Sequence, residues 1–378
     1  MKTEWAHKKL IDLADYYNGM AFKPSDWVES GTKIIRIEQL NNPLGNYDYY
    51  QGSYPEINAI HNEDLIFSWS ATLKVAIWKW GEGVLNQHLF KVVPFENVDK
   101  YFLYYLLDYN MPKLGESSHG STMKHIKRKE LETYSVKIPT TLPAQRRIAA
   151  ILASADKVIA ATQKTIAKYK QIKQGMMEDL LNEQCTMNNV QWVQKTLIEL
   201  ADYHNGMAFK PSDWANDGVK IIRIEQLNNP LGKYDYYQGM FPETSAIHNG
   251  DLIFSWSATL KVVIWQWGDG VLNQHLFKVV PASNVDKHFL YYLLDYNMPK
   301  LGESSHGSTM KHIKRKELET HTVYIPRKIA EQKRISEILS GIDAKIAAEG
   351  KVLQKYEKVK EGLMERLLNE QCTMNNEQ

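Results

Sequence analysis

The chain is a tandem repeat with a period of 187 residues. Shifting the sequence by that distance aligns Trp5 with Trp192, Asn18 with Asn205 and Pro139 with Pro326, and no gap is needed. Self-similarity at a fixed period indicates copies of one structural unit. At 378 residues the chain is also too long for one ordinary hydrophobic core. We therefore expect two packed units with the same fold.

The two copies are not equally similar along their length. About 100 of the 116 positions from Asn18 to Thr133 are identical to their mates, but only about 17 of the 41 positions from Pro139 to Asp179 are. The first segment has stayed the same while the second has drifted. The two segments therefore carry different constraints.

The drifted segment has the pattern of a long helix. Pro139 and Pro143 precede a run without proline that is rich in Ala, Lys, Gln, Ile and Leu. Apolar residues recur with a heptad period in both copies, and Lys173 and Lys360 occupy the same seam position. This narrow seam favours pairing of the two helices, although each helix could instead pack on its own domain. The predicted seam residues are Ile148, Leu152, Ile159, Ile166, Tyr169, Leu180, Ile335, Leu339, Ile346, Leu353, Tyr356 and Leu367.

The segment before each helix has the pattern of a mixed α/β domain. In the first copy, β-branched and aromatic runs predict strands, two further runs predict helices or helical turns, and a last run predicts a closing strand. The predicted strands are Lys33 to Leu40, Asp64 to Ser70, Lys74 to Trp80, Leu89 to Pro94 and Tyr134 to Pro139, and the predicted helices are Val98 to Tyr109 and Met123 to Thr133.

The order of these segments predicts the architecture. The first domain leads into the start of helix one and the second domain leaves from its end, so we expect a domain at each end of a rod of roughly 60 Å. The connections are too short for parallel helices. The predicted fold is two mixed α/β domains related by a pseudo-twofold axis and separated by a long antiparallel two-helix coiled coil. The predicted limits are 1–142 and 187–329 for the domains, and 143–186 and 330–374 for the helices.

Composition adds mainly exclusions. The net charge of +2 gives no overall electrostatic signal for nucleic acid, so a basic surface would have to be local. Cys185 and Cys372 are too few and too isolated for a disulfide framework or a zinc site, which fits a reducing cytoplasm. The N-terminus lacks a signal-peptide core, and no apolar run is long enough for a membrane span.

Motifs for catalysis are missing from the sequence. The Gly-x-Gly of Trp80 to Val84 lies between two predicted strands, where a hairpin turn is the better interpretation. Asn41 to Gly45 has only a faint similarity to the Asn-Pro-Pro-aromatic loop of amino-methyltransferases and is interpreted as a turn. No phosphate-binding loop, His-Glu-x-x-His motif or metal-ligand spacing occurs. We expect recognition without catalysis.

Two stretches carry a resemblance to a known family. They are "GSTMKHIKRKELETYSVKIPTTLPAQRRIAAIL" at Gly120 to Leu152 and its mate at Gly307 to Leu339. They resemble the specificity subunits of type I restriction-modification systems, in which an Ile-Pro strand end and an "EQxxI" motif open a long helix. "GMAFKPSDW", "IIRIEQL" and "NQHLFKV" are also similar to that family. The first copy departs from the pattern, with Ala144-Gln145 in place of Glu331-Gln332.

The resemblance implies a DNA-binding subunit with two target recognition domains on a two-helix spacer. Such a subunit binds two methyltransferase subunits and then restriction-translocase subunits, and directs adenine N6 methylation or cleavage at a bipartite DNA sequence. It would hold no cofactor itself, because S-adenosylmethionine, ATP and magnesium belong to the partners. The resemblance also implies that methyltransferases dock on the helices.

Near-identical domains predict half-sites that are inverted copies of one another, separated by less than about 18 base pairs. Positions that differ between the copies are poor candidates for base reading, which demotes Asn46, Ser53, Glu63 and Lys79. Unchanged polar and aromatic positions are the candidates for DNA contacts. Those in the domains are Lys23, Ser25, Tyr49, Tyr50, Gln51, Trp69, Ser70 and Lys74, with the mates Lys210, Ser212, Tyr236, Tyr237, Gln238, Trp256, Ser257 and Lys261.

The polar stretch that follows each domain is a candidate for phosphate contacts. Each of these candidates could also be a core or solvated side chain. A scaffold presenting two protein-binding domains and a self-sufficient methyltransferase stay open as other functions. The phosphate candidates are His119, Ser121, Thr122, Lys124, His125, Lys127 and Arg128, with the mates His306, Ser308, Thr309, Lys311, His312, Lys314 and Arg315.

Overall fold

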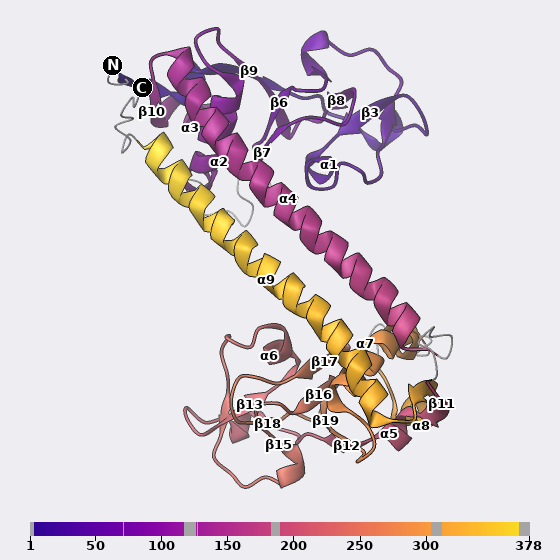
Figure 1. Cartoon of the computed structure of the whole chain (residues 1–378). Coiled ribbons are helices and arrows are strands. Elements are labelled where there is room, and N and C mark those ends of the chain that lie inside the picture. Colours follow the sequence, from indigo (N-terminus) through magenta and orange to yellow (C-terminus); the bar gives the residue numbers. More distant parts are fainter. Residues whose placement is uncertain are drawn as a thin grey trace, which may run out of the picture. The chain divides into compact units, whose positions relative to one another are not determined.

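The computed structural model describes residues 4–70, 72–116, 126, 128–182, 190–303 and 312–369. The chain divides into two units (Figure 1). Unit 1 consists of residues 1–163 and 351–378, and unit 2 of residues 164–350. Each unit therefore combines one α/β domain with segments of both long helices.

The domain of unit 1 contains two four-stranded sheets and a two-stranded ribbon. The strand orders are β2-β9-β6-β7, β4-β3-β8-β5 and β1-β10. All pairs are antiparallel except β3 with β8. The elements are β1 (Trp5–Lys9), η1 (Leu10–Asp12), β2 (Ala14–Asn18), η2 (Pro24–Asp26), β3 (Thr32–Ile35), α1 (Ile37–Asn41), β4 (Tyr49–Tyr50), η3 (Glu56–Asn58), β5 (Ala59–Ile60), β6 (Leu65–Ser68), β7 (Lys74–Ile77), β8 (Gly83–Leu85), β9 (Leu89–Pro94), α2 (Lys100–Glu116), α3 (Arg128–Thr133) and β10 (Ser135–Pro139).

The domain of unit 2 repeats this topology strand for strand. Its sheets have the orders β12-β19-β16-β17, β14-β13-β18-β15 and β11-β20. Its elements are β11 (Trp192–Thr196), α5 (Leu197–Leu200), β12 (Ala201–Asn205), η4 (Pro211–Asp213), β13 (Val219–Ile222), α6 (Ile224–Asn228), β14 (Tyr236–Tyr237), η5 (Glu243–Ser245), β15 (Ala246–Ile247), β16 (Leu252–Ser255), β17 (Lys261–Ile264), β18 (Gly270–Leu272), β19 (Leu276–Pro281), α7 (Lys287–Glu303), α8 (Arg315–Thr320) and β20 (Thr322–Pro326).

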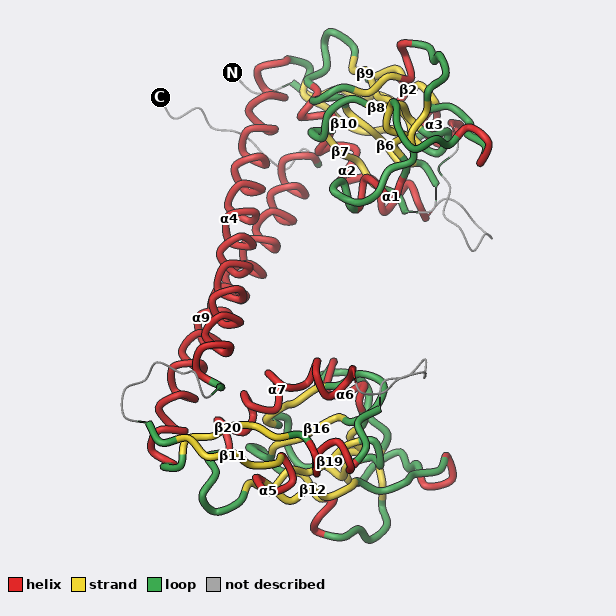
Figure 2. The backbone as a smooth tube through the Cα atoms, turned by 90° about the vertical axis from the view of Figure 1, so that its right-hand side faces the viewer, coloured by secondary structure: helices red, strands yellow, loops and turns green. Residues whose placement is uncertain are grey.

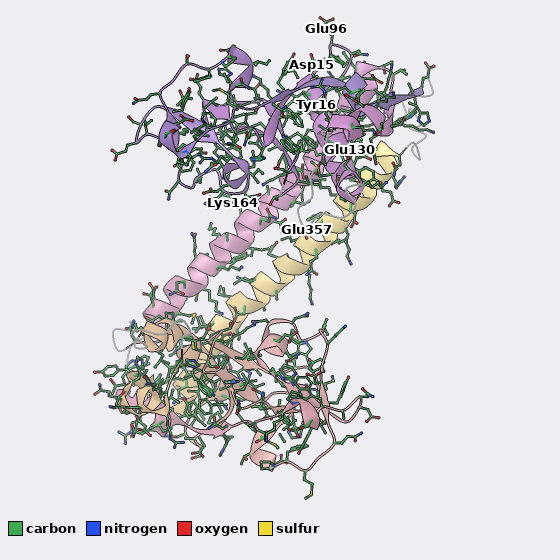
Figure 3. All side chains as sticks on the ribbon, turned by 180° about the vertical axis from the view of Figure 1, so that it is seen from behind. Asp15, Tyr16, Glu96, Glu130, Lys164 and Glu357 are labelled. Carbon is green, nitrogen blue, oxygen red and sulfur yellow. The ribbon has the colours of Figure 1, made fainter. Side chains whose placement is uncertain are left out.

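Each domain has two hydrophobic cores. The larger core lies between the first sheet and the helix that follows it, and in unit 1 its ring cluster is Tyr16, Phe67 and Phe90. Tyr16 is labelled in Figure 3. The smaller core lies under the second sheet and is centred on the fully buried Trp78. Trp265 has the same place in unit 2. Burial of these apolar side chains is the main driving force for each domain.

A buried glutamine joins each domain to its long helix. In unit 1, Gln145 accepts a hydrogen bond from the Asp99 amide at 2.7 Å and donates to the carbonyl oxygens of Asn97 and Pro139 at 3.2 and 3.0 Å. Gln332 makes the same three contacts in unit 2. The glutamine of the "AQRR" and "EQKR" motifs is therefore a structural joint.

The predicted helices are observed as α4 (Leu142–Leu180) and α9 (Ile329–Leu368). In unit 1 the end of α9 joins the core that holds the start of α4, because Met364, Leu367 and Leu368 cluster with Ile148 and Leu152. In unit 2 the end of α4 joins the core that holds the start of α9 in the same way. The α4 and α9 segments of each unit lie side by side (Figure 2). The helices thus pair in antiparallel fashion, which confirms the predicted coiled coil.

The seam residues predicted from the heptad pattern differ in burial. The predicted seam residues are buried or half-buried except Tyr356, whose exposed fraction is 38%. Its mate Tyr169 lies 5.9 Å from the Lys345 ammonium. The residue equivalent to Lys345 in the other helix is Val158, which has no charge to place over Tyr356. The amphipathic ring of Tyr356 therefore faces solvent.

Two predictions of local structure were wrong. The run from Lys33 to Leu40 is half strand and half helix, because Gln39 accepts a hydrogen bond from the Arg36 amide and starts α1. The Gly-x-Gly at Trp80 to Val84 does not form a hairpin. It links β7 to β8, which belong to different sheets. Apolar periodicity predicts neither side-chain capping nor the sheet to which a strand belongs.

No helix in the described part of the chain is both long enough and apolar enough to cross a membrane.

Candidate nucleic-acid interface

The structure brings several predicted contact residues of the first domain together at one sheet edge. β4, which carries Tyr49 and Tyr50, is the edge strand of its sheet. The amide of Val28 donates to the Tyr49 carbonyl at 3.1 Å, which holds the η2 segment with Lys23 and Ser25 against this edge. We call Lys23, Ser25, Trp27, Arg36, Tyr49, Tyr50 and Gln51 the edge cluster.

The edge cluster presents exposed polar and aromatic groups on a fixed backbone. Lys23, Ser25 and Gln51 are exposed, and Tyr49 and Tyr50 are half-buried. The Asp26 carboxylate accepts a hydrogen bond from the Lys23 amide at 2.7 Å, and the Tyr50 ring packs edge-on against Phe22 at 5.2 Å. Cationic, hydroxyl and amide groups on a rigid edge suit contacts with phosphates and base edges.

Two members of the edge cluster, Trp27 and Arg36, were missed in the sequence. Trp27 is 43% exposed, and the Arg36 guanidinium lies 4.9 Å from its ring centre. Nη1 of Arg36 pairs with Asp48, while its buried Nη2 has no acceptor among the described residues. Both residues are unchanged between the copies, and Trp27 ends the "GMAFKPSDW" stretch, so the signal was available.

Unit 2 builds the same edge, with a changed contact at Gln238. Trp214 is 47% exposed, and Arg223 lies 5.2 Å from its ring and pairs with Asp235. The side-chain amide of Gln238 donates to Asp217. The residue equivalent to Asp217 in unit 1 is Ser30, so Gln51 lacks this acid. The other members of the second cluster are Lys210, Ser212, Tyr236 and Tyr237.

A second group of predicted residues lies at the end of β6 and β16. The Trp69 ring lies 5.6 Å from the His88 ring, and the Ile126 amide donates to the Trp69 carbonyl at 2.8 Å. In unit 2, Trp256 lies between His275 at 5.6 Å and His312 at 6.0 Å. Both tryptophans also pack against the larger core, so each joins that core to the residue bonded to its carbonyl, Ile126 or Ile313.

Two pairs of predicted residues have internal partners instead of free polar groups. Ser70 is buried and its Oγ lies 3.1 Å from His88 Nδ1, as Ser257 does with His275. The Lys74 ammonium donates to the carbonyl of Leu40 at the end of α1, and Lys261 does the same in unit 2. A DNA contact would require these groups to give up their partners, so we leave them out of the proposed surface.

Most of the phosphate candidates lie outside the described residues. Of those that are described, Arg128 and Arg315 begin the short helices α3 and α8, Lys314 caps α8, and His312 forms a bridge with Ser257. Arg128 pairs with Glu132 at 3.7 Å and Arg315 with Glu319 at 3.4 Å, and Lys314 is exposed. The candidates outside the described residues are His119, Ser121, Thr122, Lys124, His125, Lys127, His306, Ser308, Thr309 and Lys311.

Possible metal ligands do not cluster in the described part of the chain. No group of three His, Cys, Asp or Glu side chains is close enough there to hold a metal ion. The cavity of about 330 Å³ bordered by His7, Lys113 and Lys137 is lined by basic, polar and apolar side chains. The edge clusters therefore remain the best-formed candidate sites.

A match to a known protein family identifies the family of this chain. The type I restriction modification DNA specificity domain matches residues 2–172 and again residues 189–358. The chain belongs to this family. It is a specificity subunit of type I restriction-modification systems, which recognises a DNA sequence.

Individual relatives agree with the family match, one over nearly the whole chain and one over less than half of it. The MjaVIII specificity subunit of Methanocaldococcus jannaschii is 24% identical, and the alignment covers 99% of this chain and 94% of that protein. The EcoBI specificity subunit of Escherichia coli is 30% identical over 41% of this chain and 33% of its own length.

Solved structures share the fold. The specificity subunit from M. genitalium has a TM-score of 0.59 at 14% identity, covering 97% of this chain and 96% of its own. A chain from a study of complex assembly and conformational transition of the type I system has a TM-score of 0.62 at 15% identity, covering 98% and 99%. The specificity subunit identified from the motifs thus also has this family's architecture.

Proposed function

We propose that each unit reads one half of a bipartite DNA target and that the two half-sites are inverted copies of one sequence. The observation that carries this proposal is the repetition of the edge cluster. The exposed tryptophan, the arginine stacked on it, the paired aspartate and the two tyrosines recur in unit 2 with nearly the same distances. Equal surfaces read equal bases, and inverted half-sites suit a protein that contains two equivalent readers.

Within each edge cluster we divide the contacts by chemistry. Lys23 is suited to a backbone phosphate, and Ser25, Tyr49 and Gln51 to base edges or sugar. Trp27 offers an apolar face to a thymine methyl or to an unstacked base step. The Arg36 Nη2 group would gain an acceptor from a base or phosphate, because a buried donor without a partner costs about 1–3 kcal/mol.

The remaining roles follow the family. The α4 and α9 pair sets the spacer between half-sites and docks two methyltransferase subunits, and restriction-translocase subunits join them. This chain is not catalytic, and S-adenosylmethionine, ATP and magnesium act in the partner subunits. The complex works on double-stranded DNA in the cytoplasm.

The test is to map N6-methyladenine in cells that express the chain with its methyltransferase. We expect one interrupted motif whose halves are reverse complements of each other. A motif with unrelated halves would refute equal reading by the two units. Absence of any motif dependent on this chain would refute the DNA-reading function itself.

A second test separates base reading from backbone binding. Replacing both tryptophans, with Trp27→Ala and Trp214→Ala, should weaken binding to target DNA at least tenfold while leaving non-specific binding unchanged. Replacing Lys23 and Lys210 by alanine should weaken both kinds of binding and reduce the slope of affinity against salt. The control is Val93→Ala with Val280→Ala, which removes partly exposed apolar groups from the other sheet.

A further inference from the structure

Three elements of unit 1 meet at one carboxylate. Asp156 of α4 accepts a hydrogen bond from the Tyr105 hydroxyl of α2 at 2.7 Å. The Lys360 ammonium of α9 pairs with the same carboxylate at 2.7 Å and lies 5.7 Å from the Tyr105 ring centre. The carboxylate therefore ties the recognition domain to both long helices.

Unit 2 contains the same arrangement with the helices exchanged. Asp343 of α9 accepts a hydrogen bond from the Tyr292 hydroxyl of α7 at 2.7 Å and pairs with Lys173 of α4 at 2.8 Å. The Lys173 ammonium lies 5.2 Å from the Tyr292 ring. We call Tyr105–Asp156–Lys360 and Tyr292–Asp343–Lys173 the two clamps. Each long helix gives an aspartate to one clamp and a lysine to the other.

The clamps persist where the rest of the helices has changed. Only about 17 of 41 helix positions from Pro139 to Asp179 match their mates, yet Asp156 and Lys173 are among those that do. In both ion pairs the two residue numbers add to the same total, 516, so one antiparallel register satisfies both. A shift in the register of α4 against α9 would break both clamps together.

The physical chemistry of the clamps suits a positioning role. The lysines occupy seam positions of the heptad, where an apolar residue would pack better, and only 16% and 20% of their side chains are exposed. A charged group in such a seam selects one register at some expense of stability. Burial raises the pKa of Tyr105 and of Tyr292, so each phenol stays protonated. Each hydroxyl is then the hydrogen-bond donor and the aspartate the acceptor.

We propose that the two clamps are positioning residues that set the number of unread base pairs between the half-sites. The lysine–aspartate pair fixes the helix register, and the tyrosine fixes each recognition domain on its own end of that pair. This inference rests on the proposed reading of a bipartite target, and assigns its spacing to residues that do not contact DNA.

The test uses the complex of the full chain with its methyltransferase and a plasmid library of targets in which the spacer varies by up to three base pairs either way. Two double variants are compared with the parent chain. Tyr105→Phe with Tyr292→Phe removes only the hydroxyl links, and Lys173→Met with Lys360→Met removes the charges from the seam. Methylation is read at every spacer by sequencing.

We expect the parent chain to methylate one spacer length and each clamp variant to methylate neighbouring lengths at least tenfold more than the parent does, with the half-site bases unchanged. If the tyrosine variant keeps the spacer preference of the parent chain, the link between domain and helix does not set the spacer. If the lysine variant keeps it, the register of the helix pair does not set the spacer. If the lysine variant does not assemble, the tyrosine variant decides. The control is Lys164→Met with Lys351→Met, two exposed helix lysines that also match.

The outcome is distinguishable from a failure of the proposed function. If the parent chain directs no motif, reading of DNA fails before spacing is measured. If the parent reads a motif and the folded variants keep its spacer, only the clamp proposal fails. Circular dichroism and thermal unfolding of each complex establish that the variants are folded.

Discussion

The two domains differ at few positions, and the differences show what the fold requires. Tyr134 donates its hydroxyl to Asn110 at 3.0 Å, and in unit 2 His321 Nε2 lies 3.1 Å from Asn297 instead. Elsewhere both partners have changed together. The hydroxyls of Thr32 and Tyr54 lie 3.3 Å apart, and their mates are Val219 and Phe241. At these two places the hydrogen bond is kept or lost as a pair, and the fold does not require particular residues to make it.

We expect the largest loss of stability from changing the buried glutamine joint, which is the same in both units. Gln145→Leu would leave the Asp99 amide and two carbonyls without their partner, at a cost of about 3 kcal/mol. Gln332→Leu should destabilise unit 2 by the same amount. Native-state hydrogen exchange on β10 and β20 measures each unit separately.

The control for the joint is Gln163→Leu, which changes an exposed glutamine of the same helix. It should alter stability by less than about 0.5 kcal/mol. A much larger effect in one unit than in the other would contradict the equivalence of the two joints.

The next effect comes from a close approach of backbone to backbone. A Cβ on Gly19 would lie 2.3 Å from the Asn86 carbonyl oxygen, and on Gly206 at the same distance from that of Asn273. Because these oxygens are main-chain atoms, Gly19→Ala and Gly206→Ala should each cost about 1–3 kcal/mol. Gly81→Ala is no suitable control because its φ is positive, whereas Gly175→Ala on α4 meets open space and should be tolerated. Thermal unfolding of the parent chain and of the Gly19→Ala, Gly206→Ala and Gly175→Ala variants measures these changes in stability.

A smaller, pH-dependent difference should separate the units. Burial, and then the Lys300 charge, lower the pKa of His321, so the unfolded state takes up a proton before the folded state does. As pH falls below about 6.5, unit 2 should lose stability at β20, while Tyr134 leaves β10 of unit 1 unaffected. Hydrogen exchange at pH 7.5 and 5.5, corrected for intrinsic rates, measures this.

His321→Tyr is the matched variant, because it restores the residue of unit 1. It should remove the pH dependence of exchange in β20. Persistence of that dependence in the variant would show that another group carries it.

The smallest effect concerns the hydroxyl pair. Thr32→Val or Tyr54→Phe alone should destabilise unit 1 by about 0.5–1 kcal/mol, whereas the double variant should be close to the parent. A double-mutant cycle in urea unfolding gives the coupling energy. A coupling near zero would mean that the pair contributes nothing and that the differences arose independently.

The sequence predicted the architecture because its strongest signals are long-range. The repeat predicted two units, the heptad seam predicted paired helices, and the short connections predicted their antiparallel order. Lys33 to Leu40 was wrong because a side-chain cap at Gln39 decides where the strand stops. The hairpin predicted at the Gly-x-Gly was wrong because no local sequence pattern indicates the sheet to which β8 belongs.

The candidate site was predicted less completely. Unchanged polar residues pointed to Lys23, Ser25, Tyr49, Tyr50 and Gln51, and the structure gathers them at one edge. Ser70 and Lys74 are equally unchanged but have internal partners. Trp27 and Arg36 are equally unchanged and could have been included, but only the structure shows that the guanidinium lies over an exposed ring. Identity between copies cannot separate a binding group from a structural one.

The glutamine joint has a consequence for how new specificities arise. Gln145 and Gln332 bond only to main-chain atoms of the domain, at the amide of one residue and the carbonyls of two others. A joint made with backbone atoms does not depend on the side chains of the domain it holds. A recombination event that exchanges one domain for another of the same backbone would therefore keep these three hydrogen bonds. The rest of the attachment uses side chains, so an incoming domain would also have to bring the clamp tyrosine and an apolar surface that fits the start of the helix.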